Sequence, residues 1–248
     1  MIAGGAMLVF LLARRGPGGV RVSRRELAWA AVIGSLLAAG GNGLVTVAEQ
    51  DVPSGLAALL IASEPLVIVL LRGATGDRAG GWTLGGVALG FVGVGILMLP
   101  GGRPDDVPLG MTLLVLVASV SWALGSFISP RVALPRDALV STGWSLLIGG
   151  AVLVAGGLLG GEGDGLDVGA FSTQSVLAFA YLVVVGSIIA FSCYAWLLAN
   201  APISRVSTYA YVNPVIAVVL GAVFLSEDVA AATVVGMALV IASVVVIV

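Results

Sequence analysis

Long apolar segments separated by short polar connections restrict the fold of this chain most. Most of them are long enough to cross the hydrocarbon core of a bilayer, which is about 30 Å thick. Strand-like alternation is missing from them, and helices satisfy every backbone polar group within a lipid-exposed segment. The sequence therefore predicts an all-α integral membrane protein. Nine segments are delimited by length and by breaking residues, at approximately 1–13, 26–48, 54–71, 82–99, 109–129, 138–159, 174–198, 203–224 and 230–248.

The composition agrees with a bilayer as the solvent and argues against several other classes of protein. Of the 248 residues, 59% are hydrophobic and 10% are charged, whereas soluble domains carry about 25% charged residues. The chain has no His and a single Cys, Cys193, so the usual metal sites and Ser-His-Asp triads are absent. We therefore expect no metal, no cofactor and no enzymatic activity. The net charge of −2, without a basic run interleaved with aromatic residues, argues against nucleic acid as a partner.

The charges of the connections predict an orientation in the membrane. If the segments alternate in direction, ten of the eleven basic residues fall on one side, and Arg103 falls on the other side together with most acidic residues. A basic excess marks the cytoplasmic face. We therefore expect a multi-pass protein of the cell (inner or plasma) membrane with its C-terminus, Val248, in the cytoplasm. The ten residues are Arg14, Arg15, Arg21, Arg24, Arg25, Arg72, Arg78, Arg131, Arg136 and Arg205.

Two proline-containing segments, 54–71 and 203–224, indicate an internal repeat. Pro65 precedes Pro214 by 149 positions, and weaker matches elsewhere recur at offsets of about 145 to 152. The repeats would cover residues 1–100 and 109–248, and the first lacks a partner for segment 109–129. We therefore predict nine transmembrane helices of a ten-helix bundle whose first helix is missing from this chain. Five helices per repeat is an odd number, so the two copies would have inverted topology, as in many secondary transporters.

Several motifs of this chain resemble those of the EamA-type transporters of the drug/metabolite transporter superfamily. The residues that carry the resemblance are Ala118–Gly125, Gly41–Gln50, Val52–Leu60 and Ser207–Gly221. The resemblance runs across the whole chain. It implies ten helices, two cytoplasmic termini, and the export or uptake of a small metabolite.

Glu64 is the most informative candidate site residue, because it lies about 16 Å along its helix from Pro53 and thus near the middle of the bilayer. A charged acid there is costly and is functional by default. It would couple protons or bind an amine; the alternative is a protonated Glu bonded to a neighbouring helix. Pro65 and Pro214 would kink their helices and free the backbone carbonyls of Ile61 and Ala210. Asn213 and Tyr209 share one helix face and could line a cavity opposite Glu64.

Three other polar or aromatic residues are candidates to line the same cavity: Trp122, Asn42 and Tyr194. Ordinary helix packing is the alternative for each of them. The GxxxG step from Gly86 to Gly90 predicts a close helix contact, either within the bundle or in a homodimer.

The leading functional hypothesis is a secondary transporter that moves a small organic metabolite, such as an amino acid, amine or nucleobase, by alternating access. No nucleotide-binding motif is present, so a gradient, with protons as the candidate coupling ion, would drive active transport. Two alternatives remain at this point. One is a truncated membrane protein that does not transport, and the other is a membrane enzyme that acts on lipid head groups.

Overall fold

A computed structural model describes the chain except for residues 77–79, 99–105, 164–167, 207–208, 210–212, 225–229 and 248. At residues 98, 168, 204–205, 214–215, 221–222 and 247 it describes the backbone alone. The described residues form helices and connecting turns, without a strand among them. The prediction of an all-α fold is therefore confirmed.

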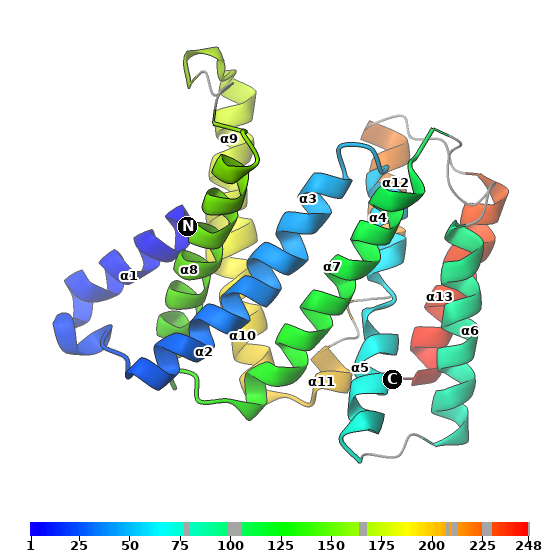
Figure 1. Cartoon of the computed structure of the whole chain (residues 1–248), viewed down its shortest axis with the longest axis horizontal. Helices are drawn as coiled ribbons and strands as arrows, with labels where there is room; N and C mark the ends of the chain where they lie inside the picture. Colours follow the sequence, from blue (N-terminus) through cyan, green and yellow to red (C-terminus); the bar gives the residue numbers. More distant parts are fainter. Residues whose placement is uncertain are drawn as a thin grey trace. The chain divides into compact units, whose positions relative to one another are not determined.

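Contacts divide the chain into two compact units, and each unit contains segments from both halves of the sequence (Figure 1). Unit 1 consists of Met1–Ala39 and Ile128–Ala201, and unit 2 consists of Gly40–Phe127 and Pro202–Val248. The predicted repeats, residues 1–100 and 109–248, thus contribute to both units, and the relation between the repeats stays a prediction.

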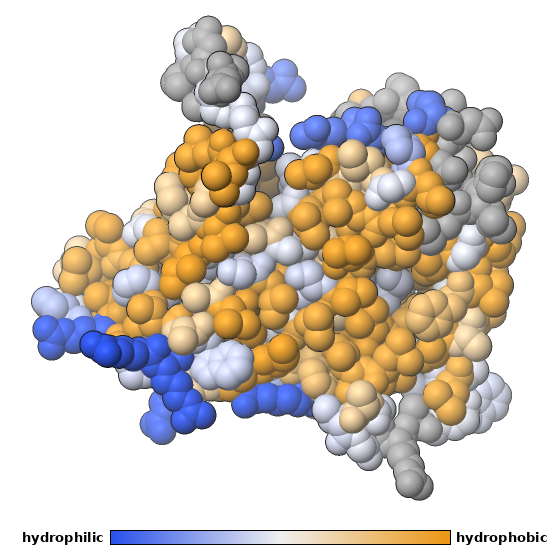
Figure 2. All heavy atoms as spheres, viewed as in Figure 1, coloured by the Kyte–Doolittle hydropathy of each residue, from blue (hydrophilic) through white to orange (hydrophobic). Residues whose placement is uncertain are grey.

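Five helices of the described part are long and apolar enough to cross a membrane. Hydrophobic residues cover the sides of the helices on the face shown in Figure 2, and hydrophilic residues gather where helices end. Helix α1, with 14 residues, is only about 21 Å long. The five helices that are long enough to cross a membrane are Arg24–Ala48, Ser54–Ala74, Leu109–Arg131, Ala138–Leu159 and Thr173–Asn200. Two shorter apolar helices cover Gly81–Leu97 and Ala231–Val246.

Unit 1 is built around helix α8 (Ala138–Leu159), against which α1 (Ile2–Arg15) and α2 (Arg24–Gly34) both pack. Helix α2 continues into the π-helical segment η2 (Ser35–Gly43). The other elements of this unit are η1 (Pro17–Gly19), η3 (Ser129–Arg131), η4 (Val168–Ala170), α9 (Thr173–Tyr181), the π-helical segment η5 (Leu182–Ile189) and α10 (Ala190–Asn200).

Glycines permit the close approach of α2 and α8. A Cβ atom on Gly34 would overlap the backbone of Ser145, and one on Gly149 would overlap the backbone of Gly34. Gly4 on α1 meets the backbone of α8 near Leu147 in the same way. Small residues at helix crossings increase van der Waals contact in membrane proteins, where lipid removes the hydrophobic driving force between helices.

Asp137 fixes the beginning of α8 and joins it to the end of α1. Its carboxylate accepts hydrogen bonds from the amides of Leu139, at 2.9 Å, and Val140, at 3.2 Å, and it forms an ion pair with Arg15. Partial burial raises the pKa of Asp137, but the hydrogen bonds from Arg15 and the two amides outweigh it and lower the pKa below its ordinary value of 3.8.

We expect the Asp137→Ala substitution to lower the free energy of unfolding by about 1 kcal/mol, as for other N-cap carboxylates. Because the pKa of Asp137 is lower in the folded state, its contribution is present above pH 3.8 and is lost as the pH falls through the folded-state pKa. Unfolding in mixed micelles, measured from pH 7 downward, tests this. The exposed Asp51 provides the matched control, Asp51→Ala, and an equal loss for both variants would contradict the prediction.

Unit 2 contains the remaining helices, and α6 (Gly81–Met98) and α13 (Ala231–Ile247) pack against each other along their length. Gly90 faces Leu66 and Ser243, and Gly93 faces Val240. The close contact predicted at the Gly86–Gly90 step therefore occurs within the chain. The other elements are α3 (Leu44–Ala48), α4 (Ser54–Ile61), α5 (Glu64–Ala74), α7 (Leu109–Ile128), α11 (Ile203–Val206) and α12 (Asn213–Phe224).

Some predictions concern residues outside the described part of the structure. Arg78 and Arg103, which contribute to the predicted orientation, are outside it, as is the C-terminal residue Val248. Most of the stretch between α11 and α12 is outside it as well, although Tyr209 is described.

Candidate functional site

The segment 54–71, predicted as one helix, is two helices in the structure. Helix α4 ends at Ile61 and α5 begins at Glu64, with Ala62 and Ser63 between them. Pro65 lies in the first turn of α5, where its missing amide proton removes no helical hydrogen bond. The proline therefore interrupts the helix completely, where the sequence predicts only a kink.

Serine hydroxyls compensate the carbonyl groups at the interruption. Ser63 Oγ donates to the Leu60 carbonyl at 2.6 Å, and Ser119 Oγ, on α7, donates to the Ile61 carbonyl at 3.5 Å. The two hydroxyl oxygens lie 3.4 Å apart. Ile61 is one of the carbonyls expected to be freed by a proline; the corresponding carbonyl of Ala210 lies outside the described residues.

Glu64 begins α5 and is only 1% exposed. One of its carboxyl oxygens accepts a hydrogen bond from the Tyr209 hydroxyl, which comes from a segment 145 positions further along the chain. Burial opposes a negative charge on this carboxyl group. The helix N-terminus and the Tyr209 donor favour a negative charge there. The carboxyl group of Glu64 is therefore subject to two opposing influences on its charge.

The structure brings Glu64 and Tyr209 together but does not gather all of the predicted site residues around them. Asn213 is the first residue of α12 and is exposed. Asn42 lies in η2 and is also exposed, and its carbonyl accepts from Thr46 Oγ1 at 2.9 Å. Trp122 is half-buried on α7, where its carbonyl accepts from Ser126 Oγ at 2.7 Å.

Two predicted site residues remain, Tyr194 and Pro214. Tyr194 is half-buried on α10 in unit 1, where it lines a separate pocket. Pro214 follows Asn213 in the first turn of α12, and only its backbone is described.

Sequence reasoning missed the serines at the helix interruption. Ser63 immediately precedes Glu64, and this polar neighbour of the acid could have identified Ser63 from the sequence. Ser119 lies within the motif Ala118–Gly125. Among the described residues, no group of three or more His, Cys, Asp or Glu residues could hold a metal ion.

Apolar helices of membrane length, one of them interrupted at a buried acid, define a polytopic membrane protein with features typical of transporters. Residues 109–248 match the EamA-like transporter family. Over 223 residues the chain is 39% identical to the "Uncharacterized inner membrane transporter YedA" of Escherichia coli K12, covering 89% of this chain and 70% of that protein. The chain therefore belongs to the EamA-like transporter family and is a multi-pass membrane transporter.

More distant comparisons agree with this family. The chain is 28% identical over 181 residues to the "Probable amino-acid metabolite efflux pump" of Escherichia coli K12, covering 71% of this chain and 60% of that protein. A crystal structure of a protein with 22% sequence identity superposes with a TM-score of 0.64, covering 98% of this chain and 83% of that one. At this identity the superposition shows a shared fold alone.

Proposed function

We propose that the chain is a secondary transporter that moves a small organic metabolite by alternating access, and that Glu64 carries the coupling proton. The observation that carries the proposal is the burial of Glu64 at a helix interruption, with its carboxyl group bonded to Tyr209. An ionisable group inside a membrane segment is expensive and marks ion or substrate pathways. Interrupted helices at the middle of the membrane are the usual position of coupling-ion sites in secondary transporters.

The packing of equivalent helices supports an inverted ten-helix architecture. The sequence repeat pairs α1 with α8, α4 and α5 with α11 and α12, and α6 with α13. In the structure α1 packs on α8, α4 packs on α12, and α6 packs on α13. Such contacts between equivalent elements are expected near a two-fold axis. Glu64 and Asn213, the first residues of α5 and α12, also occupy equivalent positions in the two repeats.

The contacts of the connections support the proposed orientation, with the basic connections and the C-terminus in the cytoplasm. Arg15, the last residue of α1, pairs with Asp137, which immediately precedes α8. Trp144 Nε1 donates to the carbonyl of Val20, in the connection between α1 and α2, at 3.1 Å. Both connections belong to the basic side in the sequence analysis. We further propose an inner-membrane location, which the similarity to YedA supports.

An amino acid is our first choice of cargo, because one relative is named as a probable amino-acid metabolite efflux pump. The direct test is uptake into proteoliposomes under an imposed pH gradient, with a panel of amino acids, amines and nucleobases. We expect at least one of them to accumulate in response to the gradient. A protein that is well folded in the vesicles but moves none of them would contradict the proposed function.

The Tyr209→Phe substitution tests the partner of Glu64. It removes one hydrogen bond to the carboxyl group and keeps the aromatic ring, so we expect the protein to fold. Because a single hydrogen bond to a charged group contributes about 1.5–3 kcal/mol, we expect pH-driven uptake to fall by about ten- to a hundredfold. Uptake rates together with thermal unfolding of the same preparation distinguish this effect from instability. An unchanged uptake rate would show that the hydroxyl group of Tyr209 does not contribute to pH-driven uptake.

A further inference from the structure

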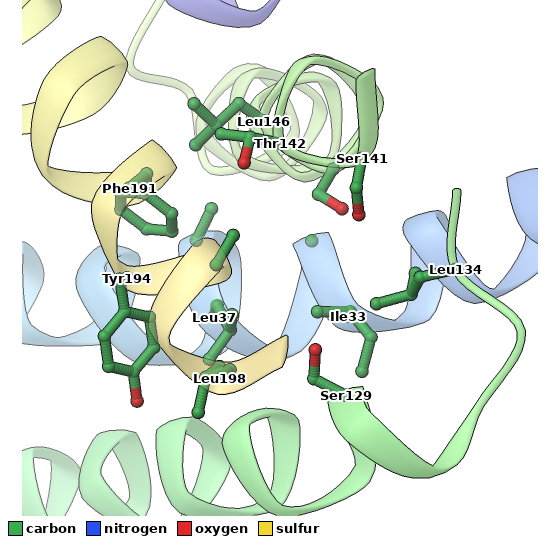
Figure 3. Close-up of a pocket in the computed structure, with 14 residues that line it drawn as sticks. Ile33, Leu37, Ser129, Leu134, Ser141, Thr142, Leu146, Phe191, Tyr194 and Leu198 are labelled. Atoms are coloured by element: carbon green, nitrogen blue, oxygen red, sulfur yellow. The ribbon is translucent and has the colours of Figure 1, made fainter. Parts of the chain in front are cut away.

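Unit 1 contains a pocket whose lining does not include Glu64 (Figure 3). Its walls come from α2 and η2 on one side, from the first turns of α8 on another, and from α10 on a third. Among the residues that line it are Ile33, Leu37, Thr142, Ser145, Phe191 and Tyr194. The pocket lies entirely within one compact unit.

Thr142 provides a hydrogen-bonding group that the described residues leave unused. Its side chain is 3% exposed, and its Oγ1 has no hydrogen-bond partner among the described residues. A buried hydroxyl without a partner loses its hydration without compensation. In Figure 3 this hydroxyl and the ring of Phe191 point toward the same space, while the hydroxyl of Tyr194 points away from Thr142.

The size and the chemistry of the pocket restrict what it can bind. Its volume is about 30 Å³ and it is partly open. One water molecule needs about 10–15 Å³ on the same scale, so the pocket takes in a group of about two heavy atoms, such as the CH2–OH of an alcohol, while the rest of the solute lies at its open side. No charged side chain is among the described residues that line it, which disfavours an ion. Phe191 and Tyr194, three positions apart on α10, lie one helical turn apart and offer aromatic surface.

We propose that this pocket binds a small uncharged solute, whose hydroxyl or amide group bonds to Thr142 and whose apolar part lies against Phe191 and Tyr194. The Thr142 hydroxyl can both donate and accept a hydrogen bond, so either group satisfies it. The proposal concerns unit 1 alone and does not depend on proton coupling or on the cargo of the Glu64 site.

Protection of an introduced thiol tests the proposal on the full-length protein in micelles. Cys193 is the single cysteine, so Cys193→Ser gives a background without thiols, and Ser145→Cys places a reporter in the pocket wall. The rate of its modification by methyl methanethiosulfonate is followed by mass spectrometry, with benzyl alcohol as the probe. Toluene lacks the hydroxyl, and benzoate carries a charge. We expect benzyl alcohol to protect the thiol at about fivefold lower concentration than toluene, the ratio expected for one neutral hydrogen bond, and benzoate not to protect it.

Variants of two hydroxyl residues identify the group that recognises the probe. Thr142→Val should remove the difference between benzyl alcohol and toluene, and Thr142→Ser should retain it. Ser192 is the matched control, because its hydroxyl is also buried without a partner among the described residues but does not line the pocket. Ser192→Ala should leave the difference unchanged.

Three outcomes would overturn the proposal. Equal protection by benzyl alcohol and toluene would show an apolar cavity without polar recognition. Persistence of the difference in Thr142→Val would show that another group binds the hydroxyl. Absence of protection would show that the pocket holds only water. If Ser145→Cys disturbs the contact of α8 with Gly34, Ala195→Cys on α10, which also lines the pocket, serves as the second reporter with the same criteria.

Discussion

The Glu64→Gln variant is expected to lose pH-driven uptake entirely, down to the level of vesicles without protein. Gln has nearly the shape of Glu and can still accept the hydrogen bond from Tyr209, but its amide group does not ionise and so cannot take up and release a proton. It also places no charge in the buried site, where Glu64 is 1% exposed, so we expect a folded protein with equal or higher thermal stability. Uptake driven by a pH gradient and thermal unfolding, measured on the same preparation, test both expectations.

Two further variants make the loss of uptake interpretable. Asp51→Asn removes a carboxyl group in an exposed turn and should leave pH-driven uptake unchanged. Glu64→Asp retains a carboxyl group but shortens the side chain, so it should retain part of the uptake. If Glu64→Gln takes up solute in response to the pH gradient as fast as the unchanged protein, Glu64 is not the coupling group, although transport itself would then be demonstrated.

The Gly34→Ala variant is expected to have the largest effect on stability. The added Cβ would overlap the carbonyl oxygen of Ser145, and it would also lie 2.7 Å from the Ser145 carbonyl carbon and 2.9 Å from its Cα. These are backbone atoms of α8, so no rotation of a side chain relieves the overlap, and α2 must move away from α8. Overpacking typically costs about 1–3 kcal/mol and occasionally more, and we expect the upper part of that range in unfolding experiments.

Gly156 on α8 provides the matched control, because a Cβ there would meet no atom of the described residues within 4 Å. We expect Gly156→Ala to leave stability unchanged or to raise it slightly, since Ala is a better helix former than Gly by about 1 kcal/mol. Equal losses for the two variants would mean that the close approach of α2 and α8 does not depend on Gly34.

The sequence was sufficient to predict the class of the protein and the approximate bounds of its helices. Segment 138–159, for example, coincides with α8, because a membrane helix is recognised from a local property, the length of an apolar run between charged or breaking residues. The position of Glu64 within such a run was likewise sufficient to identify it as a candidate. The resemblance to EamA-type transporters, read from local motifs, is confirmed by the family match.

Other features depended on contacts between distant segments. The sequence predicts a kink at Pro65, but whether that proline bends or interrupts a helix depends on partners for the exposed carbonyls. In this protein the partners of the exposed carbonyls are Ser63, which is close in sequence, and Ser119, which comes from α7. Similarly, the sequence placed Tyr209 and Asn213 on one helix face, but only the structure shows that Tyr209 contacts Glu64 and that Asn213 is exposed.

The sequence by itself determined that this chain is a helical membrane protein with an acid within one of its apolar segments, because lipid imposes the same requirement on every segment separately. Only the tertiary structure decided that Tyr209 is the partner of that acid, and that the hydroxyl of Thr142 has no hydrogen-bond partner among the described residues. Both depend on which side chains of different helices meet, and apolar helices that resemble one another in composition leave that pairing open until they pack.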